Sequence, residues 1–224
     1  FCSTPSLSSS SKLSNSSFLC INQALSKESI IFSLIGLNEI KTYTLTSPEM
    51  ASHFNYEEKE QIHLPNPMSI DKSIIRTSLL PSLIQTYDYN KARKIEDILL
   101  YEIAKTYDIH YNEDVKVALL MKGNYITNEW QHTSVKSDFY IIKGVVENLL
   151  DYLGFKNRYS FKAEEISDLH PGISAKILID RDEVGIIGRV HPSMMKDNVI
   201  VAELSMTALY NLTTKPLKFK EASK

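Results

Sequence analysis

The sequence predicts an α+β domain in which a mainly antiparallel sheet is flanked by helices. Strand-like runs outnumber helical ones along the 224 residues. Two of these runs, residues 173–179 and 184–190, flank a charged turn as the strands of a hairpin do. A few amphipathic helices interrupt the strands. They do not alternate with the strands strictly, so a parallel doubly wound sheet is not expected.

The most informative block of the chain runs from Leu169 to Pro192 and contains two His-Pro dipeptides. Alternate residues of a strand point to opposite faces of a sheet, and here both alternations carry apolar side chains. Both strands should therefore lie inside a sheet that is covered on its two faces. Pro171 and Pro192 have no backbone N–H, so we expect them to end the hydrogen-bond ladder. Residues 180–183 should form the turn.

The elements of the N-terminal half follow from cap and turn residues. Apolar residues along one side predict a helix that begins near Asn22 and ends before Gly36, which suits the position after a helix end. A strand is expected over residues 39–45, where β-forming residues are frequent. Ser47 and Pro48 then mark a helix start, with serine as the N-cap and proline at the first helical position.

Hydrophobic periodicity predicts the remaining elements. A helix beginning around Leu80 has apolar residues at the i, i+3, i+4 and i+7 positions. The clearest helix covers residues 138–153, and Gly154 ends it. The remaining apolar runs predict strands, because they match the length and composition of strands. These strands cover residues 96–107, 115–121, 158–161 and 198–204.

Composition and charge exclude several classes of function. The 25 basic and 27 acidic residues give a formal net charge of −2, so the basic face of a free-standing nucleic-acid module is not expected. The two cysteines, Cys2 and Cys20, form no framework for the fold, which suits a reducing compartment and predicts a cytoplasmic protein. No run approaches the roughly 20 apolar residues of a membrane span, so no membrane partner is expected.

The chain is expected to divide into three segments. Residues 1–21 are rich in serine and lack the basic start and apolar centre of a secretory signal, so we expect a disordered or added tail. Residues 22–212 should form the folded core. The lysine-containing residues 213–224 are interpreted as a linker to a further C-terminal domain that the sequence does not include.

A search for catalytic motifs leaves one weak candidate for a metal site. The sequence has neither a nucleophile elbow nor a phosphate loop of the Gly-x-x-x-x-Gly-Lys type. None of its six histidines forms the i, i+4 pair of a helical zinc site. The hairpin would bring His170 and His191 near each other, so a metal could bind there. The commoner alternative is that both imidazoles cap strand ends and bond to the backbone.

Further candidate positions are the strand glycines, Arg76 and Glu102. Gly185 and Gly188 occur within a strand, where glycine permits a helix or a partner to pack closely against the sheet. Arg76 precedes a helix, so it can hold a phosphate or a carboxylate, although a structural ion pair is commoner. Glu102 lies within an apolar strand. If it faces inward it needs a partner, because an unpaired buried carboxylate is costly, and Arg76 or Arg93 can supply one.

Several segments, taken in chain order, match one family. They are Gly36–Leu45, Leu64–Ser69, Ile75–Leu83, Tyr89–Arg93, Leu100–Ile103, Asp138–Gly144 and the His-Pro hairpin. This ordered set, over roughly residues 36–205, resembles the bacterial phenylalanyl-tRNA synthetase β subunits. The residues that we assign as family signatures or structural positions are Arg76, Asn90, Glu102, His170, Pro171, Gly172, Gly185, Gly188, His191 and Pro192.

The resemblance implies a class II aminoacyl-tRNA synthetase-like core that has lost its active site. In this family, phenylalanine is activated and transferred to tRNA-Phe on the α subunit, and the β core packs on α in an (αβ)₂ assembly. ATP and magnesium are therefore expected in the holoenzyme, and no cofactor is expected in this fragment. The surface that meets α should expose apolar residues. Our candidates are the solvent side of the 138–153 helix and the loop around Trp130.

The positions of the arginines indicate a core without catalytic activity. A class II site needs one arginine on the ATP α-phosphate and another from a glycine-rich strand–helix junction, whereas Arg189 lies in the middle of an expected strand. The five arginines of the sequence are at positions 76, 93, 158, 181 and 189. Two alternatives stay open. One is a free-standing class II-like adenylating enzyme, and the other is a metal hydrolase that uses His170 and His191.

Overall fold

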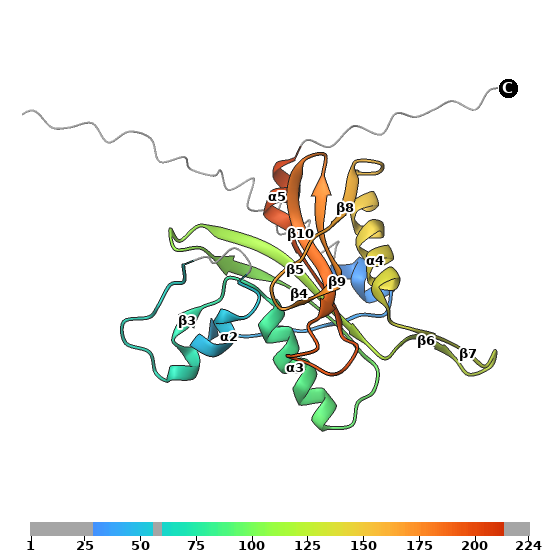
Figure 1. The fold of residues 1–224 in the computed structure, drawn as a ribbon, viewed down its shortest axis with the longest axis horizontal. Helices are drawn as coiled ribbons and strands as arrows, with labels where there is room; N and C mark the ends of the chain where they lie inside the picture. The colour runs from blue at the N-terminus through green and yellow to red at the C-terminus, as the bar shows by residue number, and fades with distance from the viewer. Residues whose placement is uncertain (1–28, 56–59, 213–224) are drawn as a thin grey trace, which may run out of the picture.

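A mixed sheet of seven strands forms the centre of the molecule (Figure 1). The computed structural model describes residues 29–55 and 60–212. The edge strand β1 runs parallel to β4, and every other neighbouring pair in this sheet is antiparallel. The strands in sheet order are β1 (Asn38–Glu39), β4 (Ile98–Tyr107), β5 (Glu113–Lys122), β11 (Ile200–Ser205), β10 (Asp182–Val190), β9 (Leu169–Ile179) and β8 (Tyr159–Ala163). The predicted α+β class is thus confirmed.

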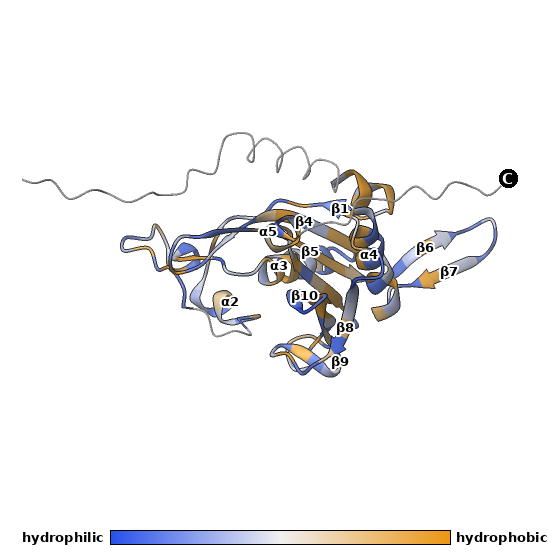
Figure 2. Ribbon diagram, turned by 90° about the horizontal axis from the view of Figure 1, so that it is seen from above, coloured by the Kyte–Doolittle hydropathy of each residue, from blue (hydrophilic) through white to orange (hydrophobic). Residues whose placement is uncertain are grey.

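Helices cover both faces of this sheet (Figures 1 and 2). On one face, α3 (Leu80–Ala92) packs its buried leucines and Tyr87 on β4, β5 and β11. On the other face, α4 (Phe139–Tyr152), α5 (Met206–Asn211) and the helical residues 29–34 form a second core. Both faces are therefore apolar, as the two alternations of the His-Pro hairpin predict.

Smaller elements lie at the margins of the sheet. The strands β2 (Leu45–Thr46) and β3 (Ile74–Ile75) pair with each other beside α2 (Pro48–Ser52) and the 3₁₀ turn η1 (Ile70–Lys72). A separate hairpin of β6 (Asn124–Asn128) and β7 (Thr133–Lys136) projects away from the body of the domain in both views (Figures 1 and 2).

The cap residues act where the sequence predicts. Ser47 accepts a hydrogen bond from the Met50 amide at the start of α2. Asp138 caps α4 by accepting from the Ile141 amide at 2.8 Å. Gly154 follows α4 with a φ of +90°, a left-handed conformation that glycine adopts without a side-chain clash. Gly36, with a φ of +88°, ends the helical residues 29–34 in the same way.

The His-Pro hairpin is present, but two of its expected details are wrong. Its turn consists of two residues, 180 and 181, because Asp180 adopts a left-handed φ of +56° and β10 begins at Asp182. The strand β9 begins at Leu169, so Pro171 lies inside it. The ladder to β10 passes from Ser174 directly to Leu169 across an irregularity. Pro171 lies in that gap, where its missing N–H removes no ladder bond.

The expected strand over residues 39–45 is broken in two. The Ile40 amide still donates to the Tyr101 carbonyl at 2.9 Å, which continues the line of β1. Two residues later, the Thr42 amide donates instead to the side chain of Glu102. The chain therefore leaves the sheet and pairs again only at β2. The predicted strands over residues 96–107, 115–121, 158–161 and 198–204 agree with β4, β5, β8 and β11 to within two residues at their ends.

Some expectations concern residues outside the described ranges. The tail over residues 1–21, the beginning of the first helix and the linker over residues 213–224 all lie there. Within the described ranges, the helices are too short or too polar to cross a membrane.

Candidate functional site

Two buried glutamates mark the polar centre of the sheet face that α3 covers. Glu102 on β4 and Glu203 on β11 both pair with Ala118 of the intervening β5, so the two side chains project from the same face. They are 1% and 3% exposed. A buried carboxylate is costly unless its oxygens accept hydrogen bonds or face a cation, so the donors around each glutamate decide what it can do.

Glu102 binds a segment that lies far away in the sequence. Its Oε1 accepts from the Thr42 amide at 3.0 Å and lies 3.2 Å from Nη1 of Arg76, while its Oε2 accepts from the Thr42 hydroxyl at 2.7 Å. Arg76 is 4% exposed and also donates to the Lys105 carbonyl. The predicted partner of Glu102 is therefore Arg76. Arg93 instead stacks on the Tyr89 ring and donates to the Tyr89 carbonyl.

Glu203 fixes the start of α3. Its Oε1 accepts from the Ser78 hydroxyl at 2.9 Å and from the Leu79 amide at 2.6 Å. Its Oε2 lies 3.1 Å from Nζ of Lys116, which also donates to the Thr77 carbonyl at 2.9 Å. The first amides of a helix have no partner within the helix. A carboxylate held there satisfies one of them and interacts favourably with the positive end of the helix dipole.

The two glutamates together attach residues 76–79 to the sheet. All four of their carboxylate oxygens accept from donors of the chain itself. The sequence allowed Arg76 to bind either a phosphate or a carboxylate. In the structure it binds the carboxylate of Glu102. The arrangement is thus an internal cross-link between residues 76–79 and the sheet face that α3 covers.

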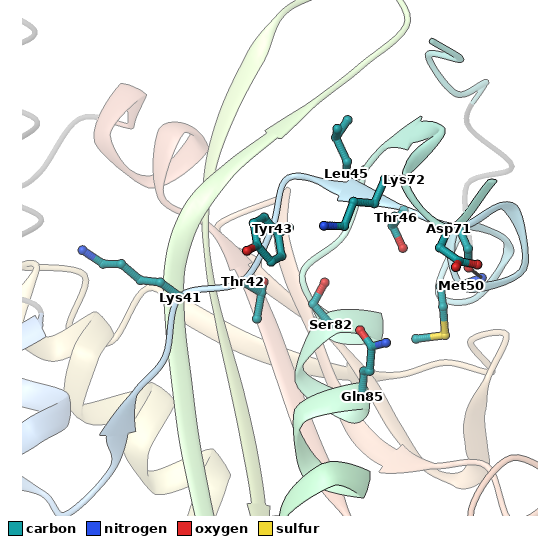
Figure 3. A pocket seen from close by; sticks show the side chains of 11 residues that line it. Lys41, Thr42, Tyr43, Leu45, Thr46, Met50, Asp71, Lys72, Ser82 and Gln85 are labelled. Carbon is teal, nitrogen blue, oxygen red and sulfur yellow. Dashed lines mark hydrogen bonds between the residues drawn. The ribbon is translucent and has the colours of Figure 1, made fainter. Parts of the chain in front are cut away.

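A pocket of about 460 Å³ opens beside this cross-link (Figure 3). Figure 3 places Thr42 between the pocket and the sheet, with Ser82 and Gln85 of α3 on one side and Lys72 and Asp71 on another. The Lys72 ammonium lies 4.3 Å from the centre of the Tyr43 ring. The lining offers hydroxyl groups, the Gln85 amide and charges of both signs.

The two histidines of the hairpin bond to the backbone beside them. Nδ1 of His170 accepts from the Gly172 amide at 3.1 Å, and Nδ1 of His191 accepts from the Ser193 amide at 3.1 Å. The backbone amide of His191 donates to the Asp168 carbonyl. Among the described residues, no group of three or more histidine, cysteine or acidic side chains could hold a metal ion. The two backbone contacts agree with the commoner alternative, and the strand-end role of both histidines stays a prediction.

Gly185 and Gly188 were expected to let a helix or a partner pack closely on the sheet, and this expectation is wrong. A Cβ atom on Gly185 would lie 2.2 Å from the Glu203 carbonyl of β11, and one on Gly188 would lie 2.7 Å from the Ile173 carbonyl of β9. Both contacts are with neighbouring strands, not with a helix or a partner above the sheet. The glycines let the irregular ladder of β10 approach its neighbours closely.

The other sequence-predicted residues have local structural contacts. Nδ2 of Asn90 donates to the Thr86 carbonyl one turn earlier in α3. Pro192 follows the end of β10, as expected. The five arginines lie on separate elements: Arg76 after β3, Arg93 after α3, Arg158 before β8, Arg181 in the hairpin turn and Arg189 in β10. Arg158 pairs with Asp180 at 2.6 Å.

Sequence reasoning missed Glu203, Lys116 and Thr42. Glu203 interrupts an apolar strand just as Glu102 does, so the argument that a buried carboxylate needs a partner applies equally to it. Thr42 carried no such signal, because its role depends on a carboxylate that lies 60 residues further along the chain.

Fold and site together define an α+β domain whose polar centre is a structural cross-link. The chain belongs to the family described as the phenylalanyl tRNA synthetase beta chain CLM domain, whose model matches residues 24–210. The resemblance seen in the sequence is thereby confirmed.

The curated relatives are named as phenylalanine–tRNA ligase beta subunits. The chain is 34% identical over 194 residues to the phenylalanine–tRNA ligase beta subunit of Geobacillus kaustophilus, an alignment that covers 83% of this chain and 24% of the relative. It is 34% identical over 187 residues to the beta subunit of Listeria monocytogenes, covering 80% and 23%. It is 35% identical over 187 residues to that of Staphylococcus aureus, again covering 80% and 23%. The chain thus spans about a quarter of the length of these relatives.

Proposed function

We propose that this chain is a non-catalytic core of the β subunit of phenylalanine–tRNA ligase, the enzyme that charges tRNA-Phe with phenylalanine at the expense of ATP. In this proposal the chain packs on the α subunit, which holds the active site, and supports an (αβ)₂ assembly. The family membership and the names of the curated relatives support the assignment to the ligase.

The closed sheet face is the observation that carries the scaffold role. An adenylating site must leave cationic groups free to bind the phosphates of ATP. Arg76 is instead paired with Glu102, and residues 76–79 lie over Glu203. The alternative of a free-standing adenylating enzyme has no support in these contacts, and neither has a metal hydrolase built on His170 and His191.

Further parts of the proposal follow from the family. The antiparallel strands with a single parallel edge strand, flanked by helices, are what we expect of a class II synthetase-like core. ATP and magnesium would bind to the α subunit, and this chain would bind neither. The tRNA would contact the assembled holoenzyme, and the protein would work in the cytoplasm.

Exchange between ATP and pyrophosphate that depends on phenylalanine tests the proposal. The purified chain alone should show no exchange, and it should co-purify with the α subunit from the same organism. The α subunit assembled with the full β chain serves as the positive control. Robust exchange by the chain alone would contradict the scaffold role. Failure of the chain to associate with α would contradict the proposed partner.

A further inference from the structure

The β6–β7 hairpin is an arm that makes few contacts with its own domain. Its two strands pair only with each other and form a sheet separate from the main one. All four residues of β7 are exposed, and Trp130 at the tip is 96% exposed. A two-stranded hairpin is marginally stable in water unless another surface covers one of its faces. Among the described residues, no other element covers a face of the hairpin beyond its base.

The base of the arm is fixed firmly. The Asn124 amide donates to Oδ1 of Asp97 at 2.6 Å, and the Ser137 amide donates to the Gly123 carbonyl at 2.8 Å. A Cβ atom on Gly123 would lie 2.3 Å from the same Asp97 oxygen, so the backbone there is tightly enclosed. The arm therefore leaves the domain in a set direction and presents its tip at a defined place.

The outer part of the arm is mostly polar and electrically neutral, and it exposes three large apolar side chains, Ile126, Trp130 and Val135. Ile126 and Val135 pair across the ladder, which puts them on one face, and they are 51% and 42% exposed. Trp130 lies in a hydrogen-bonded turn, where the Gln131 amide donates to Oδ1 of Asn128 at 3.1 Å. Over residues 124–136 one acidic residue, Glu129, balances one basic residue, Lys136. A surface that binds nucleic acid needs an excess of positive charge, so this balance favours a protein surface.

The position of the arm disfavours the segment directly after α5 as its partner. The last described element, α5, lies far from the β6–β7 hairpin in both views (Figures 1 and 2). A segment following α5 would have to cross the domain to reach Trp130. Exposed tryptophans that enter an apolar pocket on a partner supply a large share of the binding energy at protein interfaces.

We propose that the β6–β7 arm docks on the α subunit, with Trp130 inserted into an apolar pocket of that subunit. The inference rests on the proposed function, because it takes the α subunit as the partner. Ile126 and Val135 would pack beside the indole and cover the open face of the hairpin.

The test compares two exposed aromatic residues at hairpin tips. Trp130→Ala removes the docking group, and Tyr111→Ala, at the tip of the β4–β5 hairpin, removes a side chain that is 72% exposed. Both variants are made in the full β chain, and their affinity for α is measured by analytical ultracentrifugation. Trp130→Ala should weaken assembly at least about 30-fold, the size of a tryptophan hot spot. Tyr111→Ala should assemble as the unaltered chain does. Equal thermal unfolding of both variants shows that each has folded.

A second measurement follows the indole directly. The chain of 224 residues contains one tryptophan, so labelling it with 5-fluorotryptophan gives a single ¹⁹F resonance from position 130. Addition of unlabelled α subunit should shift this resonance and remove its sensitivity to D₂O, because the indole becomes buried.

The outcomes separate the two proposals. If the unaltered full β chain does not bind α, the proposed function fails. If it binds and both alanine variants bind equally well, with the ¹⁹F resonance unchanged, only the docking inference is overturned. The docking inference is also overturned if tRNA shifts the ¹⁹F resonance and α does not. The same holds if the remaining part of the β chain, added without α, shifts the resonance.

Discussion

The Nη1 atom of Arg76 lies 3.2 Å from Oε1 of Glu102, and both side chains are almost completely buried. The pair joins the segment after β3 to the middle of β4. Removing one partner of such a pair leaves a buried charge uncompensated, whereas replacing both often costs little. The pair therefore supplies a direct test of the cross-link.

Glu102→Gln should lower the free energy of unfolding by about 3–5 kcal/mol, because Arg76 keeps its charge in a buried site. The double variant Arg76→Met with Glu102→Gln should recover much of this loss. Urea denaturation of both variants measures the difference. Glu113→Gln, which breaks the exposed pair of Lys105 and Glu113, is the control and should cost less than about 1 kcal/mol. If the single and double variants are equally unstable, charge pairing is not the source of the stabilisation.

Gly185→Ala should destabilise the domain by about 1–3 kcal/mol, because its new methyl group meets the Glu203 carbonyl of β11. Gly144→Ala in α4 is the matched control. There a Cβ atom meets nothing within 4 Å, and alanine favours a helix by up to about 1 kcal/mol over glycine. Thermal unfolding should therefore move in opposite directions for the two variants. A neutral Gly185→Ala would show that β10 and β11 can separate without cost.

The stability of the domain should fall at alkaline pH through Tyr87. Its hydroxyl donates to Oδ2 of Asp197 at 2.6 Å. Burial, and then this hydrogen bond and the charge of Asp197, raise the pKa of the Tyr87 hydroxyl far above its ordinary value of about 10. Because the folded state holds the proton more tightly, this contribution is complete below about pH 10 and is lost as the pH rises above that value.

Tyr87→Phe tests this dependence, since it keeps the buried ring and removes the titrating hydroxyl. Urea midpoints measured between pH 8 and pH 11 should fall less steeply for this variant than for the unaltered chain. Tyr89→Phe, on an exposed position of the same helix, is the control and should follow the unaltered chain. Parallel curves for all three proteins would rule out Tyr87 as the source.

Asp138→Ala should destabilise the domain by about 1 kcal/mol, because the Ile141 amide at the start of α4 loses its acceptor. Asp138→Ser can accept the same hydrogen bond and should retain most of the stability. The two variants are compared by chemical denaturation at neutral pH. Equal losses for alanine and serine would mean that the charge, and not the cap, matters at this position.

Local signals in the sequence were enough to predict much of this fold. The apolar stripe of α4 and its cap Asp138 lie within a short stretch of chain, and both are as expected. The two alternations of the His-Pro hairpin likewise predicted that the sheet would be covered on both faces. Such patterns are readable because the contacts they encode lie within a few residues or repeat along one element.

The remaining features depend on contacts between distant residues. The break after β1 occurs because Glu102 binds Thr42, and no pattern near Thr42 indicates this. The crowding at Gly185 comes from β11, whose place in the sheet the sequence did not define. Of the candidate site, the pair of Arg76 and Glu102 was predictable from the cost of a buried charge, but its neighbour Glu203 was overlooked.

The order of the strands has a consequence for how the protein is made. The strand β11 is the last strand of the described sheet in the sequence, yet it lies between β5 and β10. Until a ribosome has released β11, the β4–β5 hairpin and the β8–β10 meander each expose an unpaired strand edge. The sheet is therefore completed only after its other strands have been made, and chaperones would meet two half-sheets that are open to aggregation until β11 joins them.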